Sequence, residues 1–289
     1  MSTTALPAPP TVRQRPRFSI SRFVLYAGLV GVGLFMVFPF VWMAVSSLKP
    51  FSEIFAGRTF LPATPTLDNY ANLFARYDVL GAIWNSTFIA VSFTVLSTIL
   101  CALAGYAFAK FTFPGRRWMF AFILATLAIP FAVLLVPLFI LMRNVLHWID
   151  TPLPLIIPWA ANAFGIFFMR QYLTDLPDEM LDSARVDGAS ELGIFARIVL
   201  PTSLPGLASL ATIFFISRWN DFLWPLAVLQ SPENYTLPLL LNSLRGAPGR
   251  TAYDLLMAGS VVSLLPMLVL FLVFQRWVVA GATTGAVKG

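Results

Sequence analysis

Side chains suited to chemistry are few in this chain of 289 residues. One cysteine, Cys101, and one histidine, His147, can build neither an internal disulfide nor a His/Cys metal cluster. A Ser-His-Asp triad would have to use His147, which has no elbow motif nearby. No lysine follows a glycine, so a phosphate-binding loop ending in Gly-Lys is excluded. If the protein depends on ATP, another chain must bind the nucleotide.

Polar side chains within long apolar runs are the second kind of candidate. Arg218 and Asp221 are three residues apart, which places them on one helical face where each partly neutralises the other. The other candidates for contact with a bound molecule are Asn85, Ser86, Asn162, Trp219 and Asn220. Structural roles remain open for them: Asn85 can cap a helix, Trp219 can be an interface aromatic, and Asp221 can serve only Arg218.

The composition explains why such residues stand out. Apolar residues make up 58% of the chain and charged residues 11%, where a soluble protein has roughly 25% charged. The mean hydropathy is +0.80. These values predict a polytopic membrane protein. An enzyme embedded in the membrane would need His, Asp or Glu clustered at membrane depth, which the single histidine and the uncharged runs argue against.

Uncharged intervals locate the elements that must position the polar candidates. Six such intervals of 19 to 31 residues separate the charged residues, and a spanning helix needs about 20 apolar residues. They predict an all-α bundle of six transmembrane helices, near residues 24–46, 85–108, 119–142, 152–170, 204–228 and 256–275. The fifth run either ends at Ser217 or carries Arg218 and Asp221 through the bilayer, and we expect the latter.

The lysine and arginine distribution sets the orientation. With the N-terminus inside, inner segments hold 12 of these residues and outer segments 6, leaving out Arg218. Both termini are therefore expected in the cytoplasm. Residues 1–22 are expected to be a disordered cytoplasmic tail, since the apolar run that follows is too long for a cleaved signal peptide. Residues 23–289 form the transmembrane domain. The net charge of +6 follows from the inner flanks without nucleic acid.

One inner segment breaks the charge rule. Arg170 to Ser203 carries nine charged residues, six of them acidic. Pro177 suits a helix start, Gly188 suits a turn with positive φ, and Ser190 suits the cap of a second helix. We expect a helical hairpin over about 177–201 that Pro201 ends. Its apolar stripes, which need a partner, are Met180, Leu181 and Ala184, then Leu192, Phe195, Ile198 and Val199.

The acidity of this hairpin argues against an amphipathic loop that only lies on the membrane surface, because the inner leaflet is itself anionic. A protein partner explains it better. The run from Asp182 to Pro201, D-S-A-R-V-D-G-A-S-E-L-G-I-F-A-R-I-V-L-P, resembles the EAA loop of ABC importer permeases. Asp182 and Ser183 replace the Glu and Ala usual there. The matching residues are Asp187, Gly188, Ala189, Phe195, Ile198, Leu200 and Pro201.

Other runs resemble the carbohydrate-uptake branch of these permeases. They are Asn220-Asp221-Phe222-Leu223-Trp224-Pro225-Leu226, Phe113-Pro114-Gly115-Arg116, and the C-terminal Gly285-Ala286-Val287-Lys288-Gly289, which is similar to the maltose-type (MalG-like) second permease subunit. The resemblance covers about residues 20–289. It implies the type I importer fold and a subunit that imports sugars or related polyols in a bacterial or archaeal cytoplasmic membrane.

The resemblance also implies partners. They are a second permease subunit in a heterodimer, two copies of a cytoplasmic ATPase that holds ATP and Mg, and an extracytoplasmic sugar-binding protein. This chain would bind no cofactor and would not itself be an enzyme. In the family the EAA hairpin is the coupling helix that docks on the ATPase. The expected coupling residues are Asp182, Ala184, Asp187, Gly188, Ala189, Phe195, Ile198 and Pro201.

The resemblance assigns the intramembrane candidates to the substrate pathway. They are Asn85, Asn162, Trp219, Asn220 and Asp221. Residues 231–254 are either a contact for the binding protein or a plain connector. The main alternative function is a stand-alone secondary transporter or channel, which would need coupling polar residues in several spans and no acidic inner hairpin. A scaffold subunit without a pathway role is a further alternative.

Overall fold

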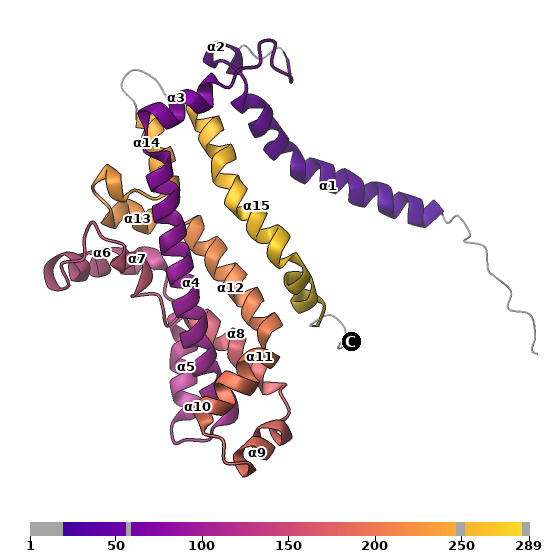
Figure 1. Cartoon of the computed structure of the whole chain (residues 1–289), viewed down its shortest axis with the longest axis vertical. Coiled ribbons are helices and arrows are strands. Elements are labelled where there is room, and N and C mark those ends of the chain that lie inside the picture. Colours follow the sequence, from indigo (N-terminus) through magenta and orange to yellow (C-terminus); the bar gives the residue numbers. More distant parts are fainter. Residues whose placement is uncertain (1–19, 56–58, 247–251, 285–289) are drawn as a thin grey trace, which may run out of the picture.

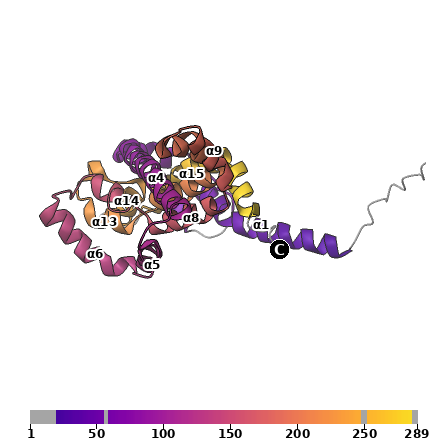
Figure 2. The same cartoon turned by 90° about the horizontal axis from the view of Figure 1, so that it is seen from below.

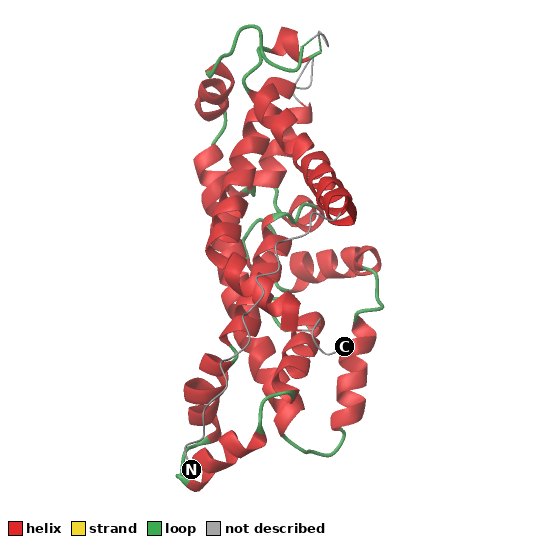
Figure 3. Cartoon of the chain, turned by 90° about the vertical axis from the view of Figure 1, so that its right-hand side faces the viewer, coloured by secondary structure: helices red, strands yellow, loops and turns green. Residues whose placement is uncertain are grey.

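The computed structural model describes residues 20–55, 59–246 and 252–284 (Figure 1). Every regular element in this part of the chain is a helix, which confirms the all-α prediction (Figure 3). Most of the predicted tail, residues 1–19, lies outside the described residues.

Within the described residues, three helices are long and apolar enough to cross a membrane. They are α1 (Ile20–Ser47), α4 (Val79–Lys110) and α15 (Tyr253–Thr284). They match the predicted spans 24–46, 85–108 and 256–275, although α4 and α15 each extend several residues beyond the predicted ends. Long uncharged intervals therefore located these three long helices well.

Two further segments are bent pairs of helices. α5 (Arg116–Thr126) meets α6 (Phe131–Ile140) and the π-helical η1 (Leu141–Val145) at 94°. Pro130 lies at this break, and its missing N–H cannot continue a helix. α10 (Glu191–Ile194), the π-helical η2 (Phe195–Val199) and α11 (Leu200–Thr202) meet α12 (Leu204–Trp219) at 80°. The span predicted over 119–142 is therefore not one straight helix, and its crossing of the membrane stays a prediction.

Two other predicted spans are interrupted. In place of a helix over 152–170, the chain forms α7 (Leu153–Ile156), an irregular stretch, and α8 (Ala163–Thr174). Prolines 154 and 158 and the Asn162 cap oppose a continuous helix there. In place of the span predicted over 204–228, the chain forms α12, which ends at Trp219, and then α13 (Leu223–Val228). The described chain thus has three candidate spans, or up to five if each bent pair is one, and the count of six stays a prediction.

The remaining elements are short. α2 (Phe51–Ile54) and α3 (Asp68–Arg76) follow α1, and α9 (Asp178–Val186) precedes α10. The 3-10 helices η3 (Pro232–Asn234) and η4 (Leu244–Gly246) flank α14 (Leu237–Ser243). Part of the segment 231–254 packs into the protein through the buried side chains of α14, and residues 247–251 lie outside the described part. Contact of this segment with a binding protein stays a prediction.

α4 lies at the centre of the molecule and packs against α8 and α12. Gly105 allows α8 to approach closely, since a Cβ there would lie 2.6 Å from the Cβ of Met169. α1 and α6 project from opposite sides of this body (Figures 1 and 2). Apolar side chains along α1, such as Leu34 and Phe35, are exposed within the single chain. These surfaces need lipid or another protein to cover them.

Candidate functional site

The predicted hairpin forms at the end of the molecule where α4 ends (Figure 1). Its first helix, α9, ends in a Schellman motif: Gly188 N–H donates to Arg185 O and Ala189 N–H to Ala184 O, both at 3.0 Å. Gly188 has a φ of +81°, and Ser190 Oγ accepts from Gly193 N–H at 3.2 Å. The glycine turn and the serine cap predicted from the sequence are confirmed.

The second helix of the hairpin differs from the prediction. Pro201 does not end it, because the helix continues through α11 to Thr202 and turns at Ser203. The π-helical turn η2 lies immediately before Pro201. A wider π turn accommodates a residue that has no N–H to donate. The break is therefore set by Ser203 and the proline that follows it at position 205.

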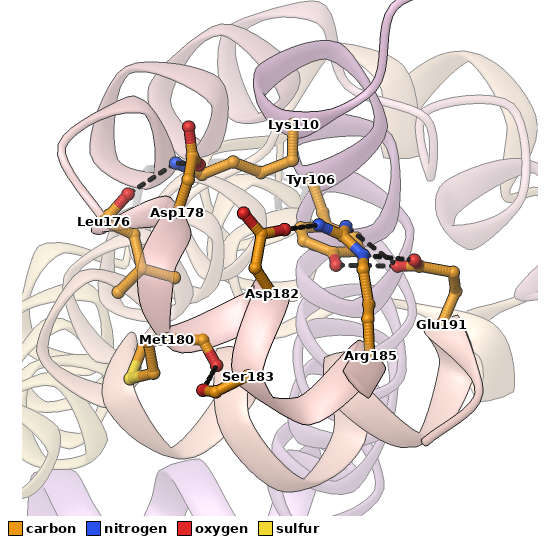
Figure 4. A network of polar contacts seen from close by, with 9 residues as sticks. All are labelled: Tyr106, Lys110, Leu176, Asp178, Met180, Asp182, Ser183, Arg185 and Glu191. Atoms are coloured by element: carbon orange, nitrogen blue, oxygen red, sulfur yellow. Dashed lines mark hydrogen bonds and ion pairs between the residues drawn. The ribbon is translucent and has the colours of Figure 1, made fainter. Parts of the chain in front are cut away.

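A lysine at the end of α4 holds the hairpin in place. Lys110 Nζ donates to the carboxylate of Asp178 at 2.7 Å and to the carbonyl oxygen of Leu176 (Figure 4). The Lys110 side chain is only 5% exposed. The start of α9 is therefore fixed directly to the end of α4.

Arg185 joins the two helices of the hairpin. Its guanidinium donates to Asp182 and to Glu191, each at 2.7 Å, and the Tyr106 hydroxyl of α4 donates to Glu191 at 3.1 Å (Figure 4). Hydrogen bonds from Arg185 hold the pKa of Glu191 below its usual range, and those to Glu191 and Asp182 raise the pKa of Arg185. The pair therefore stays charged at neutral pH and ties the hairpin to α4.

The apolar faces of the hairpin are occupied by the chain itself. Leu181, Ile194, Phe195 and Val199 are buried in a core shared with α4, α8 and α12. The expectation that both stripes await a partner is wrong for these residues, because α4 and α8 cover them. Within the predicted stripes Leu192 does stay exposed, at 74%, and Val186 outside the stripes is 88% exposed.

The predicted coupling residues lie in this one hairpin but in different environments. Asp187, Gly188 and Ala189 are exposed at its tip, and Pro201 is exposed in α11. Asp182 is exposed and bound to Arg185, Ala184 and Ile198 are half-buried, and Phe195 is buried. Sequence reasoning missed Lys110, Tyr106, Arg185 and Glu191 as the residues that hold the hairpin. Two features of the sequence could have indicated these contacts: Lys110 ends a long apolar run, and Asp182 and Arg185 are three residues apart, as in a helical ion pair.

The intramembrane candidates are only partly brought together. Asn85 does not cap a helix; its amide donates to the carbonyl oxygens of Glu233 and Tyr235 and fixes the segment before α14. Trp219 is buried, with its indole N–H bound to Ser263 O at 3.2 Å. Both serve the fold in this structure. The Asn220 amide donates to Ile216 O, and Asn220 lines a cavity of about 320 Å³ beside α14 and α15.

Asn162 and Asp221 line a second cavity of about 260 Å³. Arg218 and Asp221 form the predicted ion pair there at 2.7 Å, although α12 ends between them. Asn162 caps α8 by accepting from Gly165 N–H at 3.1 Å. The aromatic lining residues, which the sequence did not single out, are Phe93, Phe131, Trp159, Phe214 and Trp224.

Residues 98–283 match the family described as binding-protein-dependent transport system inner membrane component. The chain belongs to this family. The permease is 39% identical over 283 residues to the arabinooligosaccharide transport permease AraQ of Halalkalibacterium halodurans, covering 96% of this chain and all of that protein. It is 37% identical over 278 residues to the lactose transport permease LacG of Rhizobium radiobacter. That match covers 96% of this chain and 99% of LacG.

A solved structure also resembles the permease. It belongs to a bacterial ABC transporter involved in the import of the acidic polysaccharide alginate, with a TM-score of 0.79, 25% identity, and coverage of 91% of this chain and 99% of that one. The resemblance to ABC importer permeases inferred from residues 182–201 is confirmed. The permease is therefore an inner-membrane subunit of a binding-protein-dependent importer, and a stand-alone transporter or channel is set aside.

Asp150, between η1 and α7, organises the beginning of the segment 231–254. It adopts a φ of +64° and accepts hydrogen bonds from the N–H groups of Gln230 and Ser231 and from the Ser231 hydroxyl. Burial, the largest single influence, raises the pKa of Asp150, but these hydrogen bonds together outweigh it and lower the pKa to about 2. The charged carboxylate therefore anchors the beginning of the segment 231–254.

Proposed function

We propose that this permease forms half of the membrane pathway of an ATP-driven sugar importer and couples it to ATP hydrolysis through the hairpin of residues 177–201. The partners would be a second, different permease, two ATPase subunits that hold ATP and Mg, and an outer binding protein. Relatives similar over nearly their whole length carry names of arabinooligosaccharide and lactose transport, which supports a carbohydrate substrate.

The observation that carries the coupling proposal is the construction of the hairpin. Its inner apolar face is packed in the core of its own chain, and its tip presents Val186 and Leu192 to the outside. Lys110 and Tyr106 attach it to α4. A force applied to the tip would thus move α4 instead of only bending a loop. Closure of an ATPase dimer would bring two such hairpins together and switch the pathway between inward- and outward-facing states.

The test is to purify the tagged permease from membranes and identify the subunits that accompany it. We expect an ATPase and a second permease, and ATP-dependent sugar uptake by the reconstituted complex. Val186→Asp should weaken ATPase recovery at least tenfold, because a charge at the centre of an apolar contact must be desolvated. Phe55→Asp, a change at another exposed apolar residue far from the hairpin, is the control. A transport-competent chain recovered alone would contradict the proposal.

A further inference from the structure

The cavity that contains Arg218 lies where three helical segments are interrupted. Phe131 follows the break at Pro130, Trp159 and Asn162 lie in the stretch between α7 and α8, and Asp221 lies between α12 and α13. Phe93, near the middle of α4, forms another wall. Irregular backbone at membrane depth is tolerated where it lines a cavity or is covered by protein, and binding sites of transporters form at such interruptions.

Two buried hydrogen-bond donors in this cavity lack a partner. Among the described residues, neither Arg218 Nε nor Trp159 Nε1 has an acceptor, although both atoms are buried. The Arg218 side chain is only 9% exposed. By contrast, the indole N–H of Trp224 in the same lining is bound to Pro154 O at 2.9 Å. A buried donor without an acceptor is costly, so both donors call for an oxygen-bearing ligand.

The charges in the cavity favour a neutral ligand. Arg218 and Asp221 are its charged lining residues, and their 2.7 Å ion pair leaves no net charge. The Arg218 guanidinium also lies 4.1 Å from the centre of the Phe93 ring, which further satisfies the cation. An acidic ligand would have to compete with Asp221 for Arg218. A neutral ligand can instead use the Arg218 Nε–H that the ion pair leaves free.

We propose that this cavity binds one ring of a neutral sugar on its way through the membrane. Trp159 Nε1 and Arg218 Nε would donate to hydroxyl oxygens, and the Asp221 carboxylate would accept from a hydroxyl. The aromatic pair of Phe131 and Trp159, with ring centres 5.6 Å apart, gives the ring an apolar wall. A volume of about 260 Å³ is near the lower end of small-molecule pockets and suits a single ring.

This inference rests on the proposed function, so the test separates the two. The complete transporter, with its partner permease, ATPases and binding protein, is reconstituted in proteoliposomes. Initial uptake rates are measured for lactose, trehalose and arabinotriose, and for an alginate trisaccharide as the acidic probe. Trp159→Phe keeps an aromatic ring, although a smaller one, and removes the N–H. Trp84→Phe, at an exposed residue of α4, makes the same change in ring size and is the matched control.

We expect Trp159→Phe to lower uptake of the best neutral sugar about tenfold, as the loss of one buried hydrogen bond predicts, while ATP hydrolysis stimulated by the binding protein stays within twofold. Trp84→Phe should change neither. The subsite is refuted if Trp159→Phe transports within twofold of wild type, or if wild type prefers the acidic probe. Absence of ATP-dependent uptake of every probe by wild type would instead refute the proposed sugar import.

Discussion

At the scale of single residues, the turn of the hairpin depends on Gly188. Its φ of +81° lies in the left-handed region, while the space around it is open. The difficulty for another side chain is therefore backbone strain and not collision with a neighbour. A left-handed residue with a Cβ costs roughly 1–2 kcal/mol, and a β-branched side chain is disfavoured further.

Gly188→Val should consequently abolish ATP-dependent uptake while leaving membrane insertion largely intact. Gly188→Asn is the control, because asparagine enters the left-handed region more readily and should retain most of the uptake. Uptake by vesicles, normalised to permease abundance, gives the measurement. Normal uptake by Gly188→Val at normal abundance would exclude the turn from coupling.

Asp150 predicts a pH dependence of the contacts that hold the beginning of the segment 231–254. Its pKa is lowered from 3.8 to about 2, so the carboxylate stabilises the fold above about pH 4 and loses this contribution as the pH falls towards 2. Asp150→Asn keeps a residue that tolerates positive φ but removes the charge. We expect it to increase hydrogen exchange at the N–H groups of Gln230 and Ser231 at neutral pH and to flatten the acid dependence. Unchanged protection at pH 7 would contradict the assignment.

At the scale of elements, the hairpin and α4 behave as one unit because Lys110 joins them. Its buried side chain bonds both a carboxylate and a backbone carbonyl at the start of α9. Lys110→Met leaves Leu176 O without this donor and should loosen the hairpin. We expect proteolysis within residues 175–190 to accelerate and uptake per ATP hydrolysed to fall severalfold.

The control for this prediction is Arg117→Met. It removes a positive charge from an exposed position at the start of α5 without touching the Lys110 contacts. It should leave both proteolysis and coupling near wild type. Equal effects of the two substitutions would mean that positive charge at the inner face matters and that the Lys110 contacts with Asp178 and Leu176 do not.

At the scale of the whole molecule, cysteine labelling from each side of the membrane tests the predicted six-span topology and its orientation. Cys101, the single cysteine, is buried, so a Cys101→Ser background suits labelling by a maleimide that cannot cross membranes. Val186→Cys at the hairpin tip should react only when the cytoplasmic side is accessible. Glu233→Cys beside α14 should react in intact cells. Reaction of both from the same side would overturn the topology.

Some of this architecture follows directly from local sequence. The uncharged intervals predict α1, α4 and α15 because transfer of charges into lipid is costly at any position of a span. The Gly188 turn and the Ser190 cap are also local, since each depends on one residue and its neighbours within a few positions. The family resemblance followed from this same run of residues.

The three-dimensional arrangement decided the rest. Prolines and the Asn162 cap permit the breaks near residues 130 and 162, but the meeting of these breaks with the one near Asn220 around one cavity depends on packing. Burial of Phe195 against α4, and the gathering of Trp159, Arg218 and Asp221 from separate segments, are contacts between residues distant in sequence. The sequence determined that this protein is a membrane permease with an acidic helical hairpin. Only the tertiary structure decided which polar residues face a common cavity, because a side chain's partners are set by the packing of helices and not by its neighbours along the chain.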